Sequence, residues 1–295
     1  MKMSASTFFL LADYDFHICL QDLSEAGFSH IMWCHYWNTD FMFTAPEIRE
    51  FKKTLRDCNL TLRDVHGSEG REKKWDSPEE YRRQAGVELV RNRLEMLTEL
   101  EAEGVLVMHV PNHRFSHHAV PPELVEQRFE AVCRSLDDLM PFLEKNHLQI
   151  ALENADWENW VLLKKFMDRY PPEQLGLCYD SGHAFLEKDH SSMLSELGDR
   201  LLSIHLSDND GSFDHHLPPG YGNIDWENLC GLLARSSYQG PAAFEVGIWN
   251  SKYADKSMPP EHTPEIRKQF LTDMAERCRR VTRLLEQARQ KLTPA

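Results

Sequence analysis

Short apolar segments alternate along the chain with longer segments in which apolar residues recur at helical spacing and charged residues fill the other faces. Each short segment has the length of a strand and is followed by a stretch long enough for a helix. Because a parallel pair of strands needs a crossover connection, this alternation predicts a parallel sheet with helices packed on it. The predicted strands are 7–12, 30–33, 60–66, 104–110, 149–153, 175–180, 201–206 and 242–246.

Several intervening helices carry start signals. Thr44 with Glu47, and Ser77 with Glu80, have the spacing of a capping box, and Pro78 would take the first helical position of the second helix. Asp225 is predicted to cap the helix that follows it. The last long segment, 264–292, predicts a closing helix with Arg and Lys toward its end, where cations suit the helix dipole.

Eight strand–helix units favour a closed (β/α)8 barrel, since this fold takes about 250 residues. A doubly wound sheet usually has fewer strands and a glycine-rich first turn, and neither GxGxxG nor GxxxxGK[ST] occurs in the sequence. We therefore predict an α/β protein that forms one TIM-barrel domain over residues 1–295.

Composition narrows the function classes. The chain is 41% hydrophobic and 27% charged, so it can bury a large core. Its 47 acidic and 33 basic residues give a net charge of −14, which disfavours nucleic-acid binding. The longest apolar run near the start, 8–12, is too short for a membrane span or a secretory leader. Seven scattered cysteines without a CxxC pair favour the reducing cytoplasm over a disulfide framework.

Acidic and imidazole side chains stand at the carboxyl ends of six consecutive predicted strands, which is the end where TIM barrels carry their chemistry. Buried charges need partners, and mixed histidine and carboxylate groups are well satisfied by divalent cations. We expect a metal centre of Mn²⁺, Mg²⁺, Co²⁺ or Zn²⁺, with one to three ions per chain. The main ligands predicted are Glu153, Asp180, His205 and Glu245, and further ions could be held by His66, His109, His183, Asp214 and His216.

The stretches LGLCYDSGHAFL, SIHLSDNDGSFDHHLPPGYGNIDW and AAFEVG, in this order and spacing, resemble the xylose-isomerase-like TIM-barrel superfamily, which includes sugar phosphate isomerases and epimerases and endonuclease IV. The resemblance covers nearly the whole chain. Its epimerases imply one divalent metal on the four main ligands, with Glu153 and Glu245 moving the substrate proton. Endonuclease IV implies nine ligands for three zinc ions, and the four main and five further residues named above fill all nine matching positions.

Two enzymatic hypotheses remain open. We favour a metal-dependent isomerase or epimerase of a small sugar or sugar phosphate, in which proton transfer passes through a metal-bound cis-enediolate. The alternative is a multinuclear zinc phosphoesterase of the endonuclease IV type, in which a zinc-bound hydroxide attacks phosphorus in a small phosphate ester or a nucleic acid. An acidic chain of this size suits a small polar substrate, which favours the first. A non-catalytic barrel is disfavoured because the carboxylates at the strand ends are intact.

Other residues are candidates for contact with the substrate. His183 is a candidate catalytic residue that would donate a hydrogen bond to it. Trp33, Trp37 and Trp249 lie at or just beyond strand ends and could form flat walls for a sugar, although packing between barrel and helices would also explain them. His113 lies in a histidine-rich loop and is expected to line the entrance rather than to bind metal. A homo-oligomer is compatible with the sequence.

Overall fold

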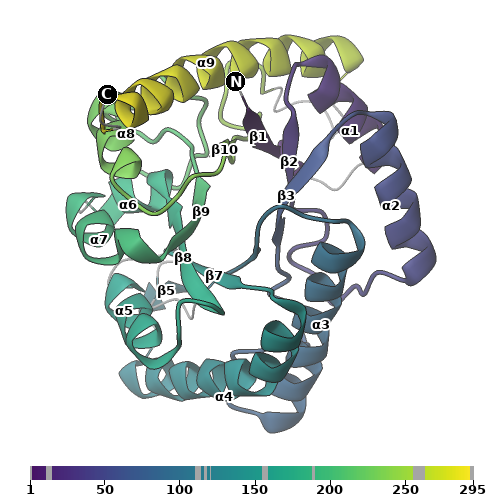
Figure 1. Ribbon diagram of the computed structural model, residues 1–295, viewed down its shortest axis with the longest axis vertical. Coiled ribbons are helices and arrows are strands. Elements are labelled where there is room, and N and C mark those ends of the chain that lie inside the picture. The colour runs from purple at the N-terminus through teal and green to yellow at the C-terminus, as the bar shows by residue number, and fades with distance from the viewer. Residues whose placement is uncertain are drawn as a thin grey trace.

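The computed structural model describes residues 2–10, 15–109, 114–115, 118–119, 121–154, 159–187, 190–254 and 263–292. Eight parallel strands form one sheet in the order β10-β1-β2-β3-β4-β7-β8-β9 (Figure 1). The strands are β1 (Met3–Ser6), β2 (His30–Trp33), β3 (Thr61–His66), β4 (Leu106–His109), β7 (Ile150–Glu153), β8 (Leu175–Asp180), β9 (Leu201–His205) and β10 (Ala242–Phe244).

The two edge strands of this sheet meet. The Leu206 N–H donates to the Ala243 carbonyl at 2.8 Å, and the Glu245 N–H donates to the Leu206 carbonyl at 3.1 Å. These bonds join the chain just beyond β9 to the end of β10 and bring the sheet round into a nearly closed barrel. The predicted (β/α)8 TIM barrel is therefore confirmed.

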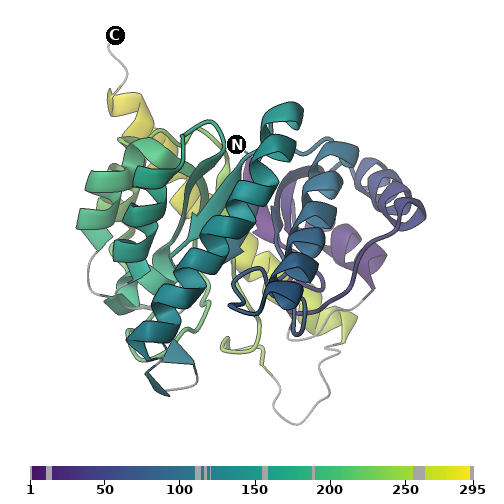
Figure 2. The same ribbon diagram turned by 90° about the horizontal axis from the view of Figure 1, so that it is seen from below.

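Helices surround the strands on the outside (Figure 1, Figure 2). They are α1 (Phe16–Glu25), α2 (Ala45–Asp57), α3 (Glu80–Glu99), α4 (Pro122–Asn146), α5 (Asn159–Arg169), α6 (Ser181–Glu187), α7 (His190–Leu197), α8 (Trp226–Ala234) and α9 (Pro264–Leu292). A 3₁₀ turn, Gly198–Arg200, precedes β9, and a small hairpin of β5 (Arg114–Phe115) and β6 (His118–Ala119) lies between β4 and α4. The predicted closing helix is α9, whose buried residues Phe270, Met274 and Cys278 recur every fourth position on one face.

Two of the three start signals act as predicted. Glu47 accepts the Thr44 N–H at 2.7 Å, as a capping box requires, and Asp225 accepts the Asn228 N–H at 3.1 Å. The Ser77 signal was wrong, because α3 begins only at Glu80. The Ser77 N–H closes a turn onto the Lys74 carbonyl and its hydroxyl accepts the Glu79 N–H, so this serine stabilises the turn before the helix.

The first predicted strand, 7–12, was also wrong. The first strand is Met3–Ser6, which pairs with β10 on one side and β2 on the other. Serine occupies every second position of this strand, so it does not form an apolar run, yet all four of its residues are buried. Phe9 and Leu10 follow it as buried residues outside any strand, and 11–12 lie outside the described residues.

The alternation of side chains along a strand positions the site. Val107, Ala151 and Cys178 form a small apolar cluster apart from the main core. His109, Glu153 and Asp180 each lie two residues further along the same strands, so they point to the same face and stand above that cluster. The strand period thus brings polar side chains from different strands to one end of the barrel.

Candidate metal centre

Four of the predicted ligands converge at the carboxyl ends of the strands. One ligand atom from each of Glu153, Asp180, His205 and Glu245 lies within 4.8 Å of the others. His205 Nδ1 stands between two carboxylates, 3.0 Å from Glu153 Oε1 and 2.9 Å from Glu245 Oε2. The first three residues are fully buried and the side chain of Glu245 is 12% exposed, so the three carboxylates of the group share a small volume from which water is largely excluded.

Unsatisfied polar atoms in this group fit a divalent cation. Glu153 Oε2, Asp180 Oδ2 and His205 Nε2 are buried and have no hydrogen-bond partner. A single unmet hydrogen bond of a buried polar atom costs about 1–3 kcal/mol. An unpaired buried charge costs more than this. Three carboxylates and one imidazole are also the donor set that Mn²⁺, Mg²⁺ or Zn²⁺ accepts in proteins. These residues therefore fit the metal that the sequence predicts.

A second group shares Glu153 with the first. Ligand atoms of His66, His109 and Glu153 lie within 4.8 Å of one another. His66 Nε2 is 3.2 Å from His109 Nε2, and the two atoms lie 3.6 and 3.3 Å from Glu153 Oε2. The opposite nitrogen of each ring is engaged, because His66 Nδ1 bonds the Gly67 carbonyl at 2.9 Å and His109 Nδ1 bonds Glu69 at 2.8 Å.

A third group lies on the other side. Asp214 Oδ2 is 3.3 Å from His183 Nε2 and 3.1 Å from His216 Nε2. His183 lies in the first turn of α6. Its N–H donates to Asp180 at 2.7 Å, and its Nδ1 bonds the Asn154 carbonyl at 2.7 Å. All nine predicted ligand positions therefore fall into three adjoining groups.

Asp208 organises the loop that carries Asp214 and His216. Its buried carboxylate accepts the N–H groups of Gly220 at 2.6 Å and Ile224 at 3.1 Å, and the Trp226 indole N–H at 3.2 Å. One carboxylate thereby fixes both ends of the loop and the start of α8.

Opposite charges within the cluster shift the pKa values of its members. Burial alone would lower the pKa of His109, but the adjacent carboxylates of Glu153 and Glu69 raise it to about 10. Burial would also lower the pKa of His216, but the charge of Asp214 outweighs burial and raises it to about 10. Burial would raise the pKa of Glu245, yet the charge of His205 lowers it to about 2. Imidazolium and carboxylate charges therefore balance one another when no metal is bound.

Aromatic rings stand beside the cluster. The ring of Trp37 lies 5.4 Å from His66 and 5.7 Å from His109, and the ring of Trp249 lies 6.1 Å from His216. Phe8 connects the two tryptophans, at 6.3 Å from Trp37 and 5.6 Å from Trp249. These three half-buried rings form a wall over the metal-ligand groups.

Trp33 does not belong to this wall, which corrects its assignment as a substrate contact. It is 1% exposed and packs against Phe16, Phe43 and Phe51, in the layer between β2 and the first two helices. Strand alternation turns its side chain outward from the barrel, away from the cluster. The other candidate, His113, lies outside the described residues.

Three residues beside the ligand groups were not predicted from the sequence. Glu69 follows β3 by three residues and looks like an ordinary loop charge, and Phe8 was assigned to a strand. Cys178 lies inside an apolar strand segment, yet its sulfur lies within 4.8 Å of ligand atoms of Glu153 and His205. Only the position two residues before Asp180 could have indicated it, since the two share a strand face.

The family follows from a direct comparison of sequences. Residues 20–280 match the family model described as xylose isomerase-like TIM barrel. The chain belongs to this family. It is 32% identical over 247 residues to the uncharacterized protein y4fM of Sinorhizobium fredii, which covers 76% of this chain and 78% of that protein. A second relative, uncharacterized protein MJ1614 of Methanocaldococcus jannaschii, is 30% identical over 150 residues, 50% of this chain and 56% of that one.

Solved structures share the fold of this family member. A D-tagatose 3-epimerase-like protein superimposes with a TM-score of 0.72 at 18% identity, covering 99% of this chain and 100% of that chain. An L-ribulose 3-epimerase gives 0.72 at 16% identity over 98% and 96%. The E. coli 3-keto-D-glucoside 4-epimerase YcjR gives 0.70 at 19% identity over 95% and 99%. At these identities the likeness is one of fold.

The helices in the described part of the chain include none with the length and apolar character of a membrane span.

Proposed function

We propose that this protein is a divalent-metal-dependent isomerase or epimerase of a small sugar or sugar derivative. The observation that carries the proposal is the pair of carboxylates on His205, with Glu153 at 3.0 Å and Glu245 at 2.9 Å, inside a buried group of four metal-ligand side chains. The solved structures of this fold that are titled sugar epimerases support the same class.

Glu153, Asp180, His205 and Glu245 would hold the metal. A divalent cation bound there would polarise a substrate carbonyl and acidify the neighbouring C–H bond. This group suits Mn²⁺ or Mg²⁺ because three of its four side chains are carboxylates.

Glu153 and Glu245 would move the proton. They reach His205 from β7 and from the end of β10, two strands that are separated by β8 and β9 in the barrel. The pKa of each is lowered, since the charge of His205 outweighs burial, so both are ionised at neutral pH as a base must be. One carboxylate removes the proton from carbon and the other returns one, and the face that receives it sets the stereochemistry.

The remaining groups would orient the substrate. The Asn154 carbonyl holds Nδ1 of His183, so its Nε2, which lies 3.3 Å from Asp214 Oδ2, is the ring nitrogen that would hydrogen-bond a substrate hydroxyl. Trp37, Phe8 and Trp249 would cover the carbon skeleton and exclude water. We place the enzyme in a reducing compartment, in keeping with seven free cysteines.

Exchange of the substrate proton with solvent tests this function directly. The protein is incubated with Mn²⁺ in D₂O and with D-tagatose, D-psicose or L-ribulose, and deuterium incorporation next to the carbonyl is followed by NMR. We expect incorporation and a second epimer with at least one ketose. Absence of exchange with a wide panel of ketoses, phosphorylated ones included, would refute the proposal.

A second candidate function is a multinuclear zinc phosphoesterase acting on a small phosphate ester or a nucleic acid. The two flanking groups, His66 with His109 and His183 with Asp214 and His216, favour it, because they provide more ligand positions than proton transfer needs. A zinc-loaded protein that hydrolyses bis(4-nitrophenyl) phosphate but exchanges no ketose proton would support this candidate over the first.

A further inference from the structure

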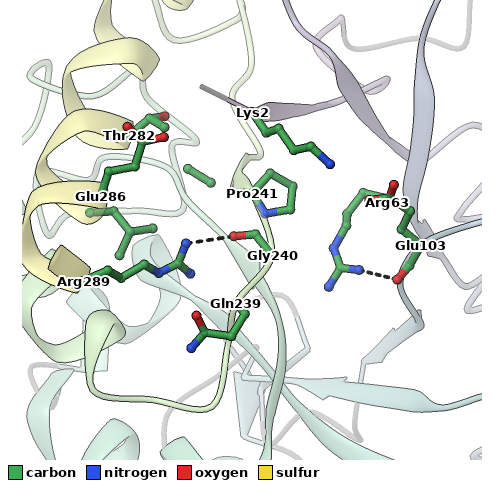
Figure 3. A pocket seen from close by; sticks show the side chains of 11 residues that line it. Lys2, Arg63, Glu103, Gln239, Gly240, Pro241, Thr282, Glu286 and Arg289 are labelled. Atoms are coloured by element: carbon green, nitrogen blue, oxygen red, sulfur yellow. Dashed lines mark hydrogen bonds between the residues drawn. The ribbon is translucent and has the colours of Figure 1, made fainter. Parts of the chain in front are cut away.

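A hollow of about 390 Å³ opens at the end of the barrel opposite to the metal centre (Figure 3). Arg63 lines it from β3, the same strand that carries His66 at its carboxyl end. The two are three positions apart, which corresponds to about 10 Å along a strand. The other walls come from Lys2 before β1, from the loop that leads into β10 and from the last turns of α9.

Three cations from distant parts of the chain meet in this hollow: Lys2, Arg63 and Arg289. Two carboxylates, Glu103 and Glu286, also line it, so the formal charge of the lining is 3 − 2 = +1. The whole chain carries −14, which makes this one of the places where positive charge gathers against the overall charge. Figure 3 shows the two guanidinium groups reaching into the hollow from opposite walls.

Main-chain carbonyls hold the Arg63 guanidinium. The residue is 9% exposed, and its terminal nitrogens donate to the carbonyls of Glu103 at 2.7 Å and Leu202 at 3.1 Å. Its Nε is buried without a hydrogen-bond partner. The ion pair with Asp64 is long, at 3.8 Å, and the Asp64 oxygens already accept bonds from Ser203 and Val105.

Main-chain carbonyls also fix the second guanidinium. Arg289 donates to Gly240 at 3.1 Å and to Tyr238 at 2.7 Å. The guanidinium carbons of Arg63 and Arg289 lie 5.6 and 5.8 Å from the centre of the Tyr238 ring, so one ring spaces both groups. Because the Arg63 guanidinium is already held in place, a ligand that bonds to it would pay little ordering entropy.

We propose that this hollow binds a small hydroxylated molecule through a single oxyanion group, either phosphate or carboxylate. Guanidinium forks recognise both groups through paired hydrogen bonds, and Lys2 adds a third cation. Glu103 and Glu286 repel a second anionic group and accept hydrogen bonds from hydroxyls, which sets the preference for a singly anionic, polyhydroxylated ligand. The site is separate from the metal centre and stands independently of the proposed function.

Inorganic phosphate and acetate are the probes for the test, each titrated into the full-length protein by calorimetry. We expect saturable phosphate binding that weakens up to about fivefold in Lys2→Gln and tightens by a similar factor in Glu286→Gln. A change of this size corresponds to the interaction energy of one partly exposed charge. Acetate binding with the same pattern would indicate a carboxylate ligand, and phosphate binding alone would indicate a phosphate ester.

Glu245→Gln is the control for phosphate bound at the metal centre, because it alters that centre and should leave the affinity of the hollow unchanged. Lys2 is exposed and Glu286 half-buried, so both variants should fold, which a melting curve verifies. The proposal is overturned by absence of saturable binding, by affinities that neither Lys2→Gln nor Glu286→Gln changes, or by binding that disappears in Glu245→Gln.

Discussion

Glu69 Oε1 lies 2.8 Å from His109 Nδ1. This carboxylate accepts the N–H at Nδ1, so that loss of the other ring proton frees the Nε2 lone pair, which then faces His66 Nε2 at 3.2 Å and Glu153 Oε2 at 3.3 Å. A carboxylate behind a histidine fixes the ring orientation and makes the facing nitrogen a better metal ligand. A residue outside the nine predicted ligands would thus prepare one of them.

Replacement of Glu69 should therefore weaken the group formed by His66, His109 and Glu153. We expect Glu69→Ala to lower metal affinity there by about 10- to 100-fold, and Glu69→Gln to retain part of it, since an amide oxygen can still accept the N–H. Calorimetric titration with Zn²⁺ measures both affinity and stoichiometry. Glu72→Ala, an exposed carboxylate on the same loop, is the matched control, and equal effects of the two alanine variants would contradict the role of Glu69.

The carboxylate of Glu245 should be essential for turnover. Glu245→Gln keeps the shape of the side chain but removes the base, so we expect kcat to fall by about 10²- to 10⁴-fold. The thermal unfolding curve should show that the protein remains folded. Glu227→Gln, on the exposed side of the first turn of α8, should retain full activity. Normal proton exchange by the Glu245 variant would remove this residue from the mechanism.

Metal content distinguishes the two candidate functions. Elemental analysis of protein purified with ample metal should give close to one Mn or Mg per chain for the isomerase or epimerase. Two or three Zn per chain would instead favour the phosphoesterase. Removal of the metal by EDTA should lower Tm by roughly 5 °C or more, because a ligand that binds only the folded state stabilises it. An unchanged Tm with full activity after chelation would exclude a metal from the site.

Metal and protons should compete for the cluster. The pKa values of His109 and His216 are raised to about 10 by their carboxylate partners. Both rings are therefore imidazolium ions at pH 7, and each must lose its second ring proton before it binds metal. Metal affinity should therefore rise with pH between about 6 and 9. Calorimetry in two buffers with different ionisation enthalpies should detect proton release. Binding that takes up protons, or that is independent of pH, would contradict this balance.

Two tryptophans provide a test of core against site. Trp33→Ala should cost about 3–5 kcal/mol in the free energy of unfolding, because the side chain is 1% exposed and fills the layer between barrel and helices. Trp37→Ala should change stability much less and should raise KM, since its ring lies over His66 and His109. Denaturant titration and steady-state kinetics separate the two effects. The reverse pattern would show that the wall over the cluster is misassigned.

The sequence determined the barrel and the end of it at which the predicted ligands lie. Hydrophobic periodicity is local, so segments such as 175–180 and 201–206 were recognisable as strands without knowledge of their neighbours. Parallel strands place their carboxyl ends together, which is why Asp180 and His205 could be assigned to one rim from their positions alone. The strand formed by Met3–Ser6 was missed for the complementary reason, as its burial comes from pairing with β10 and β2 rather than from apolar side chains.

Only the tertiary structure decided which groups touch. The contact between Glu69 and His109 joins residues 40 positions apart, and the hollow of Lys2, Arg63 and Arg289 joins the two ends of the chain. The sequence makes Trp33 and Trp37 equally good candidates for substrate contact. The direction of each side chain depends on strand register and on the course of a loop. Such contacts depend on how distant segments are placed in space, and a periodic pattern along the chain contains no information about that placement.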